Sequence, residues 1–240
     1  MSFTSETKVK DIALSNPAAT QILEDAGLDY CCGGGKSLHE ACLHADVPAE
    51  EILNRLRENS KHVDPGEASW TLAPLGDLTR HIRERHHRYV REAIARVQPL
   101  SDKVVAKHGK NHSELAEIRT AFGVLSQELT THMLKEDSVL FPHIVRMEES
   151  VIQKEPVLPP PFGTVRNPVA MMMHEHDVAG IALRDLRRAS NGYSAPPDAC
   201  ISHQTLYQAL AEFETDLHQH IHLENNILFP RAIEMERACS

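Results

Sequence analysis

The sequence has neither a long apolar run nor a concentrated basic run. No stretch approaches 18 consecutive apolar residues, and the N-terminus lacks the apolar core of a secretory signal. The formal net charge is -9 at pH 7, and no arginine stripe offsets it. We therefore expect a cytoplasmic protein with neither a membrane nor a nucleic acid as its partner.

Cysteine and aromatic residues are scarce. Aromatic residues make up 5% of the chain, and the cysteines are Cys31, Cys32, Cys42, Cys200 and Cys239. An odd number with irregular spacing argues against a disulfide framework in a reducing compartment, so we interpret the cysteines as thiols. Histidine shows the opposite bias, with 16 copies against one tryptophan. This excess points to metal chemistry.

One motif occurs twice in the chain. The segments from His132 to Pro142 and from His220 to Pro230 both read H-x3-E-x3-L-F-P. On an α-helix, residues i and i+4 are offset by about 40° around the axis and by about 6 Å along it. Each copy therefore places an imidazole and a carboxylate on the same helix face. Such a pair is half of a metal site.

A further histidine precedes each copy at nearly the same distance. His87 stands 45 residues before His132, and His176 stands 44 residues before His220. These offsets suit a helix, a turn and a second helix that folds back, so each half of 75–236 is one helical hairpin. We predict an all-α fold, in which an up-down four-helix bundle follows a small helical N-terminal domain.

Such a bundle would direct six potential ligands inward: His87, His132, Glu136, His176, His220 and Glu224. Imidazole and carboxylate ligands without thiolate suit iron or manganese better than a soft metal. We interpret the set as two metal ions bridged by Glu136 and Glu224. Any one histidine alone is more simply explained as a solvated or hydrogen-bonded core residue. The recurrence of the whole pattern is what favours the metal site.

The domain organisation follows from composition. We expect a small helical domain over 1–60, a linker over 61–74 that is rich in Pro, Gly and polar residues, and the bundle over 75–240. Ser37 and Glu40 have the spacing of a capping box, which predicts a short helix after Ser37. Because so few residues make a thin core, we expect the small domain to lean on the bundle or on a second subunit, as in a homodimer.

The segment from Asp29 to Lys36 contains Cys31, Cys32 and three glycines. Consecutive Cα atoms are about 3.8 Å apart, whereas a disulfide usually needs about 4.4 Å or more, so the two cysteines are poorly placed to bridge each other. Free thiols, metal ligation and a bond to another chain remain as interpretations. The simpler alternative is a glycine turn with two incidental buried cysteines.

Proline sets several expected helix ends. The first bundle helix is expected over 74–97, and the proline-containing stretch 149–167 is expected to be a non-helical crossover. Pro142 and Pro230 are each expected to kink or end their helices.

These motifs together resemble the RIC family of iron-sulfur cluster repair proteins, of the ScdA or YtfE type. The D-Y-C-C-G-G signature falls at 29–34 and the H-x3-E-N-N-x-L-F-P motif at 220–230, so the likeness covers nearly the whole chain. The resemblance implies a hemerythrin-like bundle with two iron ions in an oxo- or hydroxo-bridged di-iron centre at the six positions above. It favours His87 over His86, and His176 over His174.

The resemblance also implies a function. It is the repair of iron-sulfur clusters damaged by nitric oxide or oxidants, through iron donation or nitric oxide removal, with damaged iron-sulfur proteins as partners. Cys31 and Cys32 would then be client-facing thiols. Two alternatives stay open: a di-iron oxidoreductase that reduces nitric oxide, and a hemerythrin-like carrier or sensor of O2 or nitric oxide. The Cys-Cys module favours repair, because a plain carrier needs no such appendage.

Overall fold

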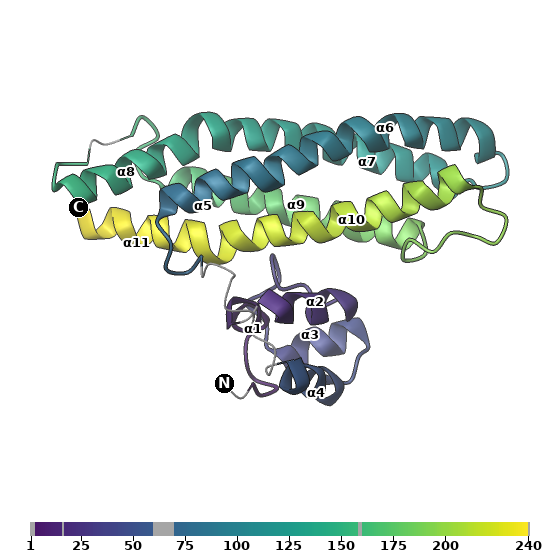
Figure 1. Cartoon of the computed structure of the whole chain (residues 1–240), viewed down its shortest axis with the longest axis horizontal. Coiled ribbons are helices and arrows are strands. Elements are labelled where there is room, and N and C mark those ends of the chain that lie inside the picture. The colour runs from purple at the N-terminus through teal and green to yellow at the C-terminus, as the bar shows by residue number, and fades with distance from the viewer. Residues whose placement is uncertain (1–2, 16, 60–69, 158–159, 240) are drawn as a thin grey trace. The chain divides into compact units, whose positions relative to one another are not determined.

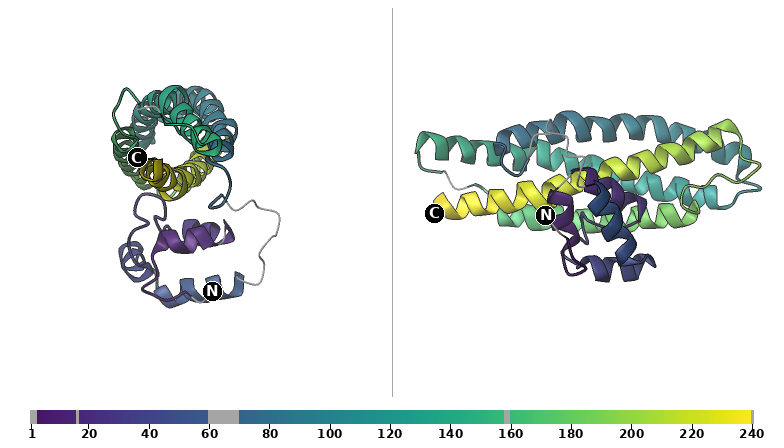
Figure 2. Two further views of the ribbon diagram at one scale, coloured as in Figure 1. Left: turned by 90° about the vertical axis from the view of Figure 1, so that its left-hand side faces the viewer. Right: turned by 60° about the horizontal axis from the view of Figure 1, so that its bottom comes forward.

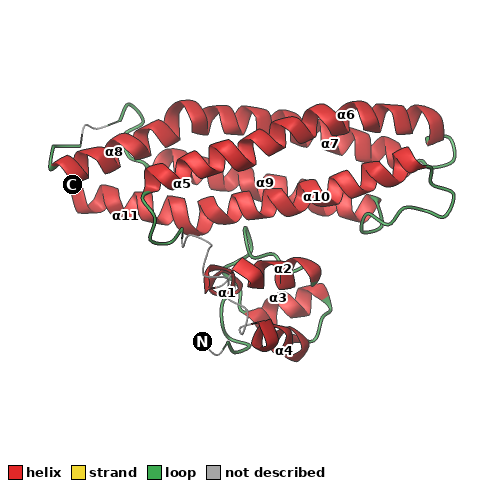
Figure 3. Cartoon of the chain, viewed as in Figure 1, coloured by secondary structure: helices red, strands yellow, loops and turns green. Residues whose placement is uncertain are grey.

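A computed structural model of the chain describes residues 3–15, 17–59, 70–157 and 160–239. Every regular element in these ranges is a helix (Figure 3), which confirms the all-α class. None of these helices combines the length and the apolar character that crossing a bilayer requires. Residues 61–69 of the expected linker lie outside the described ranges.

The chain divides into two compact units. The first comprises Met1–Pro74 together with His218–Arg231, and the second comprises Leu75–Leu217 together with Ala232–Ser240. The proposed domain limits of 1–60 and 75–240 stay a prediction.

The N-terminal part of the first unit contains α1 (Val9–Ser15), α2 (Pro17–Asp25), α3 (Leu38–Ala45) and α4 (Ala49–Asn59). Leu23, Leu38 and Ile52 have no exposed surface and lie in one apolar cluster. The predicted capping box is confirmed, because the Ser37 hydroxyl accepts from the Glu40 N–H while the Glu40 carboxylate accepts from the Ser37 N–H. Short helices are thus held by a shared core and by caps.

Four helical runs make the up-down bundle, and Figure 2 shows them arranged around a common axis. The first two runs are α5 (Leu75–His81), a π-helical segment (Ile82–His87) and α6 (Arg88–His108), then α7 (Glu114–Lys135), a π-helical segment (Glu136–Leu140) and α8 (Phe141–Gln153) (Figure 1). The last two are α9 (Arg166–Ala189), then α10 (Ile201–Leu223), a π-helical segment (Glu224–Leu228) and α11 (Phe229–Cys239).

Each run buries an apolar stripe. In α7 the buried positions recur at helical spacing, at Leu115, Ile118, Phe122, Leu125 and Leu129. The ring of Phe122 meets that of Phe213 from α10 edge-on, with the centroids 5.3 Å apart. Aromatic pairs in this geometry stabilise a core beyond the area they bury.

Two helix ends differ from those expected. Pro99 lies inside α6, which continues to His108, so the expected end at residue 97 was wrong. Proline in a helix interior costs about 3 kcal/mol. Val97, Ser101 and Val104 are buried on both sides of it, and that packing offsets the cost. Likewise α8 continues to Gln153, so the crossover begins later than residue 149.

Pro142 and Pro230 do not end their helices. Each follows a π-helical segment, in which the N–H of Phe141 donates to the carbonyl of Glu136 and the N–H of Phe229 donates to that of Glu224. A prolyl ring clashes with the carbonyl four residues before it, and the wider turn is one way to relieve that clash. The matched irregularity therefore exists as a π-bulge that starts at the glutamate of each motif.

The internal repeat extends to a pair of capping carboxylates. Glu148 accepts hydrogen bonds of 2.7 and 2.8 Å from the N–H groups of Leu75 and Gly76, at the start of α5. Glu236 accepts one of 2.7 Å from the N–H of Val165, directly before α9. A carboxylate at a helix N-terminus satisfies N–H groups that lack an intrahelical partner and complements the helix dipole. Each glutamate thereby closes its own hairpin.

We expect Glu148→Gln and Glu236→Gln each to lower the free energy of unfolding by about 1 kcal/mol, because the isosteric amide keeps the shape but loses the charge. Urea unfolding of the full chain followed by circular dichroism measures this. Glu149→Gln is the matched control, since Glu149 is exposed and adjacent. Equal losses from all three variants would contradict a capping role.

Candidate metal centre

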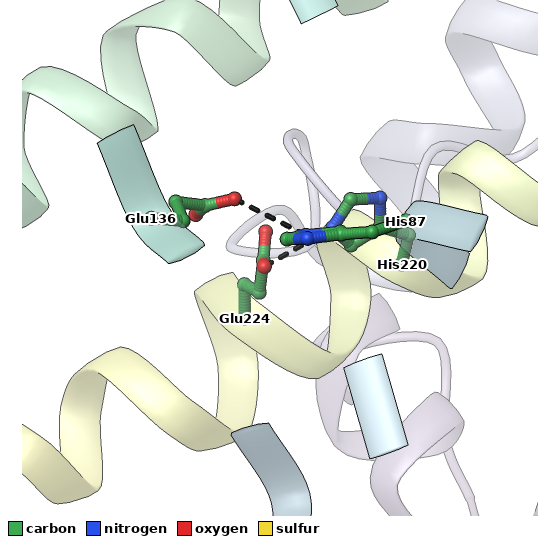
Figure 4. A group of neighbouring side chains, drawn as sticks. All are labelled: His87, Glu136, His220 and Glu224. Carbon is green, nitrogen blue, oxygen red and sulfur yellow. Dashed lines mark hydrogen bonds and ion pairs between the residues drawn. The ribbon is translucent and has the colours of Figure 1, made fainter. Parts of the chain in front are cut away.

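Four buried side chains meet in the bundle interior: His87, Glu136, His220 and Glu224. They offer ligand atoms that all lie within 4.8 Å of one another, and their side chains are at most 1% exposed. Figure 4 shows both carboxylates directed toward the two imidazoles. The arrangement is that of a metal-binding group.

A second group overlaps the first. His132, Glu136, His176 and Glu224 also offer ligand atoms within 4.8 Å of one another, and all four residues are buried. The two groups share both glutamates and differ in their histidines. The structure thus brings all six residues predicted from the sequence into two adjoining groups of two imidazoles and two carboxylates.

Local helix geometry explains the convergence. His132 and Glu136 are one turn apart, with Nε2 and Oε2 separated by 3.2 Å. His220 and Glu224 repeat this pair, with Nε2 and Oε1 separated by 3.1 Å. In both copies the glutamate is the first residue of a π-helical segment. π-bulges inside α-helices occur frequently at functional sites.

The histidines present their Nε2 atoms to the interior. The Nε2 of His87 lies 3.4 Å from Oε2 of Glu136. The Nε2 atoms of His132 and His176 lie 3.0 Å apart. Two imidazole nitrogens this close point at a common position. A neutral imidazole has a lone pair on its unprotonated nitrogen. With that lone pair on Nε2, each ring can bind a metal ion that lies between them.

Two carboxylates outside the six candidate ligands contact the outer ring nitrogen, Nδ1, of a candidate histidine. The Nδ1 of His87 lies 3.0 Å from Asp137, and the Nδ1 of His132 lies 2.8 Å from Glu175. Such partners fix the imidazole tautomer with the proton on Nδ1, which leaves Nε2 as the ligand atom. Sequence reasoning missed both residues. The available signal was an acidic residue directly beside a ligand, as Asp137 is beside Glu136.

Each outer carboxylate also binds a cation. Asp137 lies 2.6 Å from Arg91, and Glu175 contacts Lys135. Burial alone would raise the pKa of Asp137, but hydrogen bonding to His87 and the charge of Arg91 lower it below its ordinary value. Burial alone would likewise raise the pKa of Glu175, but hydrogen bonds and charges from Lys135 and His132 lower it below its ordinary value. Both outer groups are therefore carboxylates at neutral pH.

The donor set fits a metal centre. Two carboxylates buried this close together repel each other unless protons or cations compensate them. Oxygen and imidazole donors without thiolate suit iron or manganese, and pairs of helices that supply bridging glutamates are the arrangement of bundle di-metal sites. Glu136 and Glu224 belong to both groups of potential ligands.

Neighbouring histidines lie elsewhere. His86 is buried, but its Nδ1 lies 3.1 Å from Asp216 and it belongs to neither group. His174 is exposed. His222 is buried, its pKa is lowered to about 4 by burial, and its Nδ1 accepts from the amide of Asn226 at 2.9 Å. Of each ambiguous pair, the structure places His87 and His176 in the centre.

The Cys-Cys loop is organised by one carboxylate. Oδ1 of Asp29 accepts from the N–H groups of Cys31, Cys32 and Gly33 at 3.2, 2.9 and 2.9 Å. The two Sγ atoms are 3.8 Å apart, well beyond a disulfide bond. Asp29, Cys31 and Cys32 also form a third group of potential metal ligands within 4.8 Å.

The two thiols differ in exposure. Cys31 is 4% exposed, and hydrogen bonding to the Cys32 thiol together with burial raises its pKa. Cys32 is half-buried. The role of both cysteines as client-facing thiols stays a prediction, and Cys31 has little exposed surface to serve it. Of the two cysteines, Cys32 has more exposed surface.

The two asparagines after Glu224 bind the same loop within the first compact unit. The amide of Asn226 donates to the carbonyl of Tyr30 at 3.1 Å, and that of Asn225 donates to the carbonyl of Cys31 at 3.4 Å. Sequence reasoning assigned them no role. The sequence feature that could have indicated a role is the difference between the two motifs. Asn225 and Asn226 follow Glu224, whereas Asp137 and Ser138 follow Glu136.

Comparison with known proteins agrees with these features. Residues 78–232 match the family model described as the hemerythrin HHE cation binding domain. The iron-sulfur cluster repair protein YtfE of Musicola paradisiaca is 32% identical over 231 residues, which are 96% of this chain and 98% of that protein. The chain belongs to the YtfE-type family of iron-sulfur cluster repair proteins.

Other YtfE-type relatives agree in length and identity. The probable iron-sulfur cluster repair protein of Haemophilus influenzae is 32% identical over 234 residues, 97% of this chain and 99% of that protein. YtfE of Citrobacter koseri is 33% identical over 226 residues, 94% of this chain and 96% of that protein. Residues 5–60 match ScdA_N, a domain of unknown function. The family resemblance drawn from the motifs is confirmed.

We expect Asp137→Asn and Glu175→Gln each to weaken metal binding by about 10- to 100-fold, because an amide no longer holds the proton on the outer nitrogen of the ligand histidine. Competition with a chelator of known affinity measures the change. Glu128→Gln, at an exposed position of α7, is the control. An unchanged affinity in both variants would show that these carboxylates serve only the surface ion pairs.

Proposed function

We propose that the chain repairs iron-sulfur clusters damaged by nitric oxide or oxidative stress, and that a non-haem di-iron centre in the bundle carries this function. The observation that supports the proposal is the pair of overlapping ligand groups with two shared glutamates. Its relatives along almost the whole chain are named iron-sulfur cluster repair proteins.

The proposed ligands are His87 and His220 for one iron ion, His132 and His176 for the other, and Glu136 and Glu224 as bridges to both. When bound, iron in this ligand set supplies a redox-active Lewis acid that can take up a small molecule such as nitric oxide or O2. The absence of thiolate from the set also suits a metal that is passed to a client. Iron donation and nitric oxide removal are both compatible with it.

The chain's own residues prepare this centre in two ways. Burial of the six side chains excludes bulk water, so the imidazoles and carboxylates interact strongly with a bound cation. Asp137 and Glu175 orient His87 and His132 and keep a proton on the outer nitrogen of each. Both effects favour binding of a cation at the inner nitrogens.

We expect the iron-loaded protein to hold two iron ions per chain and to restore activity to an enzyme whose iron-sulfur cluster was damaged by nitric oxide. His176→Ala should lose iron and repair together, because it removes a buried ligand. His174→Ala, two residues away and exposed, should keep both. Elemental analysis and recovered enzyme activity are the measurements.

Several outcomes would overturn this assignment. One tightly bound zinc per chain after expression in iron-replete medium would refute the di-iron centre. Turnover of nitric oxide under reductant without repair would make the protein an oxidoreductase. Reversible binding of nitric oxide or O2 without either activity would make it a carrier or sensor.

We further propose that the Cys31–Cys32 loop meets the damaged iron-sulfur protein, or a second copy of the chain, through Cys32. Support comes from the partial exposure of Cys32 and from the backbone hydrogen bonds by which Asp29 presents it. Buried Cys31, with its raised pKa, would support the loop rather than react first.

We expect Cys32→Ser to keep two iron ions and nitric oxide binding but to slow repair or abolish a dimer, because the ligands lie elsewhere. Lys36→Ser, an exposed change in the same loop, is the control. Repair assays and analytical ultracentrifugation provide the readouts. Repair at the wild-type rate with an unchanged oligomeric state would mean that the thiol has no such role.

A further inference from the structure

A second cluster of potential ligands lies at one end of the bundle, outside the centre. There α6 turns into α7, and the loop after α9 leads into α10 (Figure 1). The sequence supplies H-x3-H at His108 and His112, and C-x2-H at Cys200 and His203. Short spacings of this kind are typical of zinc ligands, which come as one pair from each of two segments.

These four side chains approach one another in the structure. Nε2 of His108 lies 3.1 Å from Sγ of Cys200. The ring centroid of His203 lies 6.1 Å from that of His108 and 5.4 Å from that of His112. Two imidazoles on one tetrahedral zinc, with Zn–N near 2.0 Å, place their centroids about 5 Å apart. Among the described residues no three ligand atoms of this cluster lie within 4.8 Å of one another, so the side chains must rotate to share one ion.

His203 is the side chain that most needs a ligand. It has no exposed surface, and among the described residues neither of its ring nitrogens has a hydrogen-bond partner. A buried polar group left without a hydrogen bond destabilises the fold. Burial lowers its pKa, so the imidazole is neutral at pH 7, which is the form that binds a metal. No hydrogen bond opposes rotation of this ring.

Cys200 offers a thiolate. It directly precedes α10, and the N–H groups of His203 and Ser202 bind its sulfur. These bonds, with the nearby charge of Lys107, lower the pKa of the thiol despite some burial. A lowered pKa reduces the proton release that metal binding by a thiol requires.

The fourth ligand comes from a hydrogen-bonded pair, His112 and Asp198. His112 lies 3.1 Å from Asp198 through Nε2 and 3.2 Å from Glu114 through Nδ1. Either His112 leaves Asp198 to bind the ion, or it orients the Asp198 carboxylate as ligand, in the manner of a carboxylate–histidine pair. Both choices complete a four-coordinate set.

We propose that His108, Cys200 and His203, with His112 or Asp198 as the fourth ligand, form a binding site for one zinc ion. The thiolate selects a softer cation than the six oxygen and nitrogen ligands of the bundle centre, so the two sites hold different metals. His108 belongs to the first hairpin and Cys200 to the second, so the ion cross-links the two hairpins. The site binds zinc whether or not the chain repairs clusters.

The test uses full-length protein already loaded with iron, to which Zn²⁺ or Co²⁺ is added. We expect one further equivalent to resist a weak chelator, Co²⁺ to give a thiolate charge-transfer band, and Zn²⁺ to protect Cys200 from iodoacetamide. Cys200→Ser should weaken binding at least 10-fold and abolish the band, with the iron content unchanged. His108→Ala should do the same.

Cys32→Ser is the matched control, because Cys32 belongs to the other thiol-containing group. It should leave zinc binding and the Co²⁺ band intact. The proposal fails if no divalent ion binds beyond the iron, if Cys200→Ser binds zinc as the wild type does, or if Cys32→Ser is the variant that loses it. Circular dichroism of each variant checks that the fold is kept.

Discussion

Two carboxylates, those of Glu136 and Glu224, lie wholly buried and within 4.8 Å of the same imidazoles. A buried carboxylate costs several kcal/mol unless cations and hydrogen bonds compensate it. The other side chains of the centre contribute to this compensation. Imidazoles surround the glutamates, and Asp137 and Glu175 stand behind two of those imidazoles, each paired with a cation nearer the surface. The outermost layer is thus a pair of cations, Arg91 and Lys135, that compensate the outer carboxylates.

The convergence of the six residues was accessible from the sequence because i, i+4 spacing is an intrinsic property of the helix. The repeat of His132 and Glu136 as His220 and Glu224 therefore carries geometric information without any knowledge of packing. The outer partners were not accessible in this way. Which carboxylate reaches the far nitrogen of His132 depends on how α7 meets α9, and that contact is tertiary.

Helix type and several ends were predictable, but their interruptions were not. Pro99 inside α6 shows that a buried stripe on both sides overrides a local breaker. The π-helical segments are set by one extra residue between hydrogen-bonded groups, a pattern that side-chain periodicity does not reveal. The roles of Asn225 and Asn226 likewise depend on a loop nearly 200 residues away in the chain. Local chemistry was thus predictable, and long-range pairing was not.

The π-bulges also change the direction of side chains further along each helix. One residue more per turn rotates every later side chain by about 100° relative to an uninterrupted helix. In an uninterrupted helix Glu136 and Glu148, twelve residues apart, would differ in phase by about 120°. The bulge brings them to nearly the same phase of the run, in which Glu136 lies in the centre and Glu148 binds the start of α5. The same holds for Glu224 and Glu236. The chain between each pair is a spacer of fixed length, in which deletion of a single residue would misdirect either the metal ligand or the carboxylate that closes the hairpin.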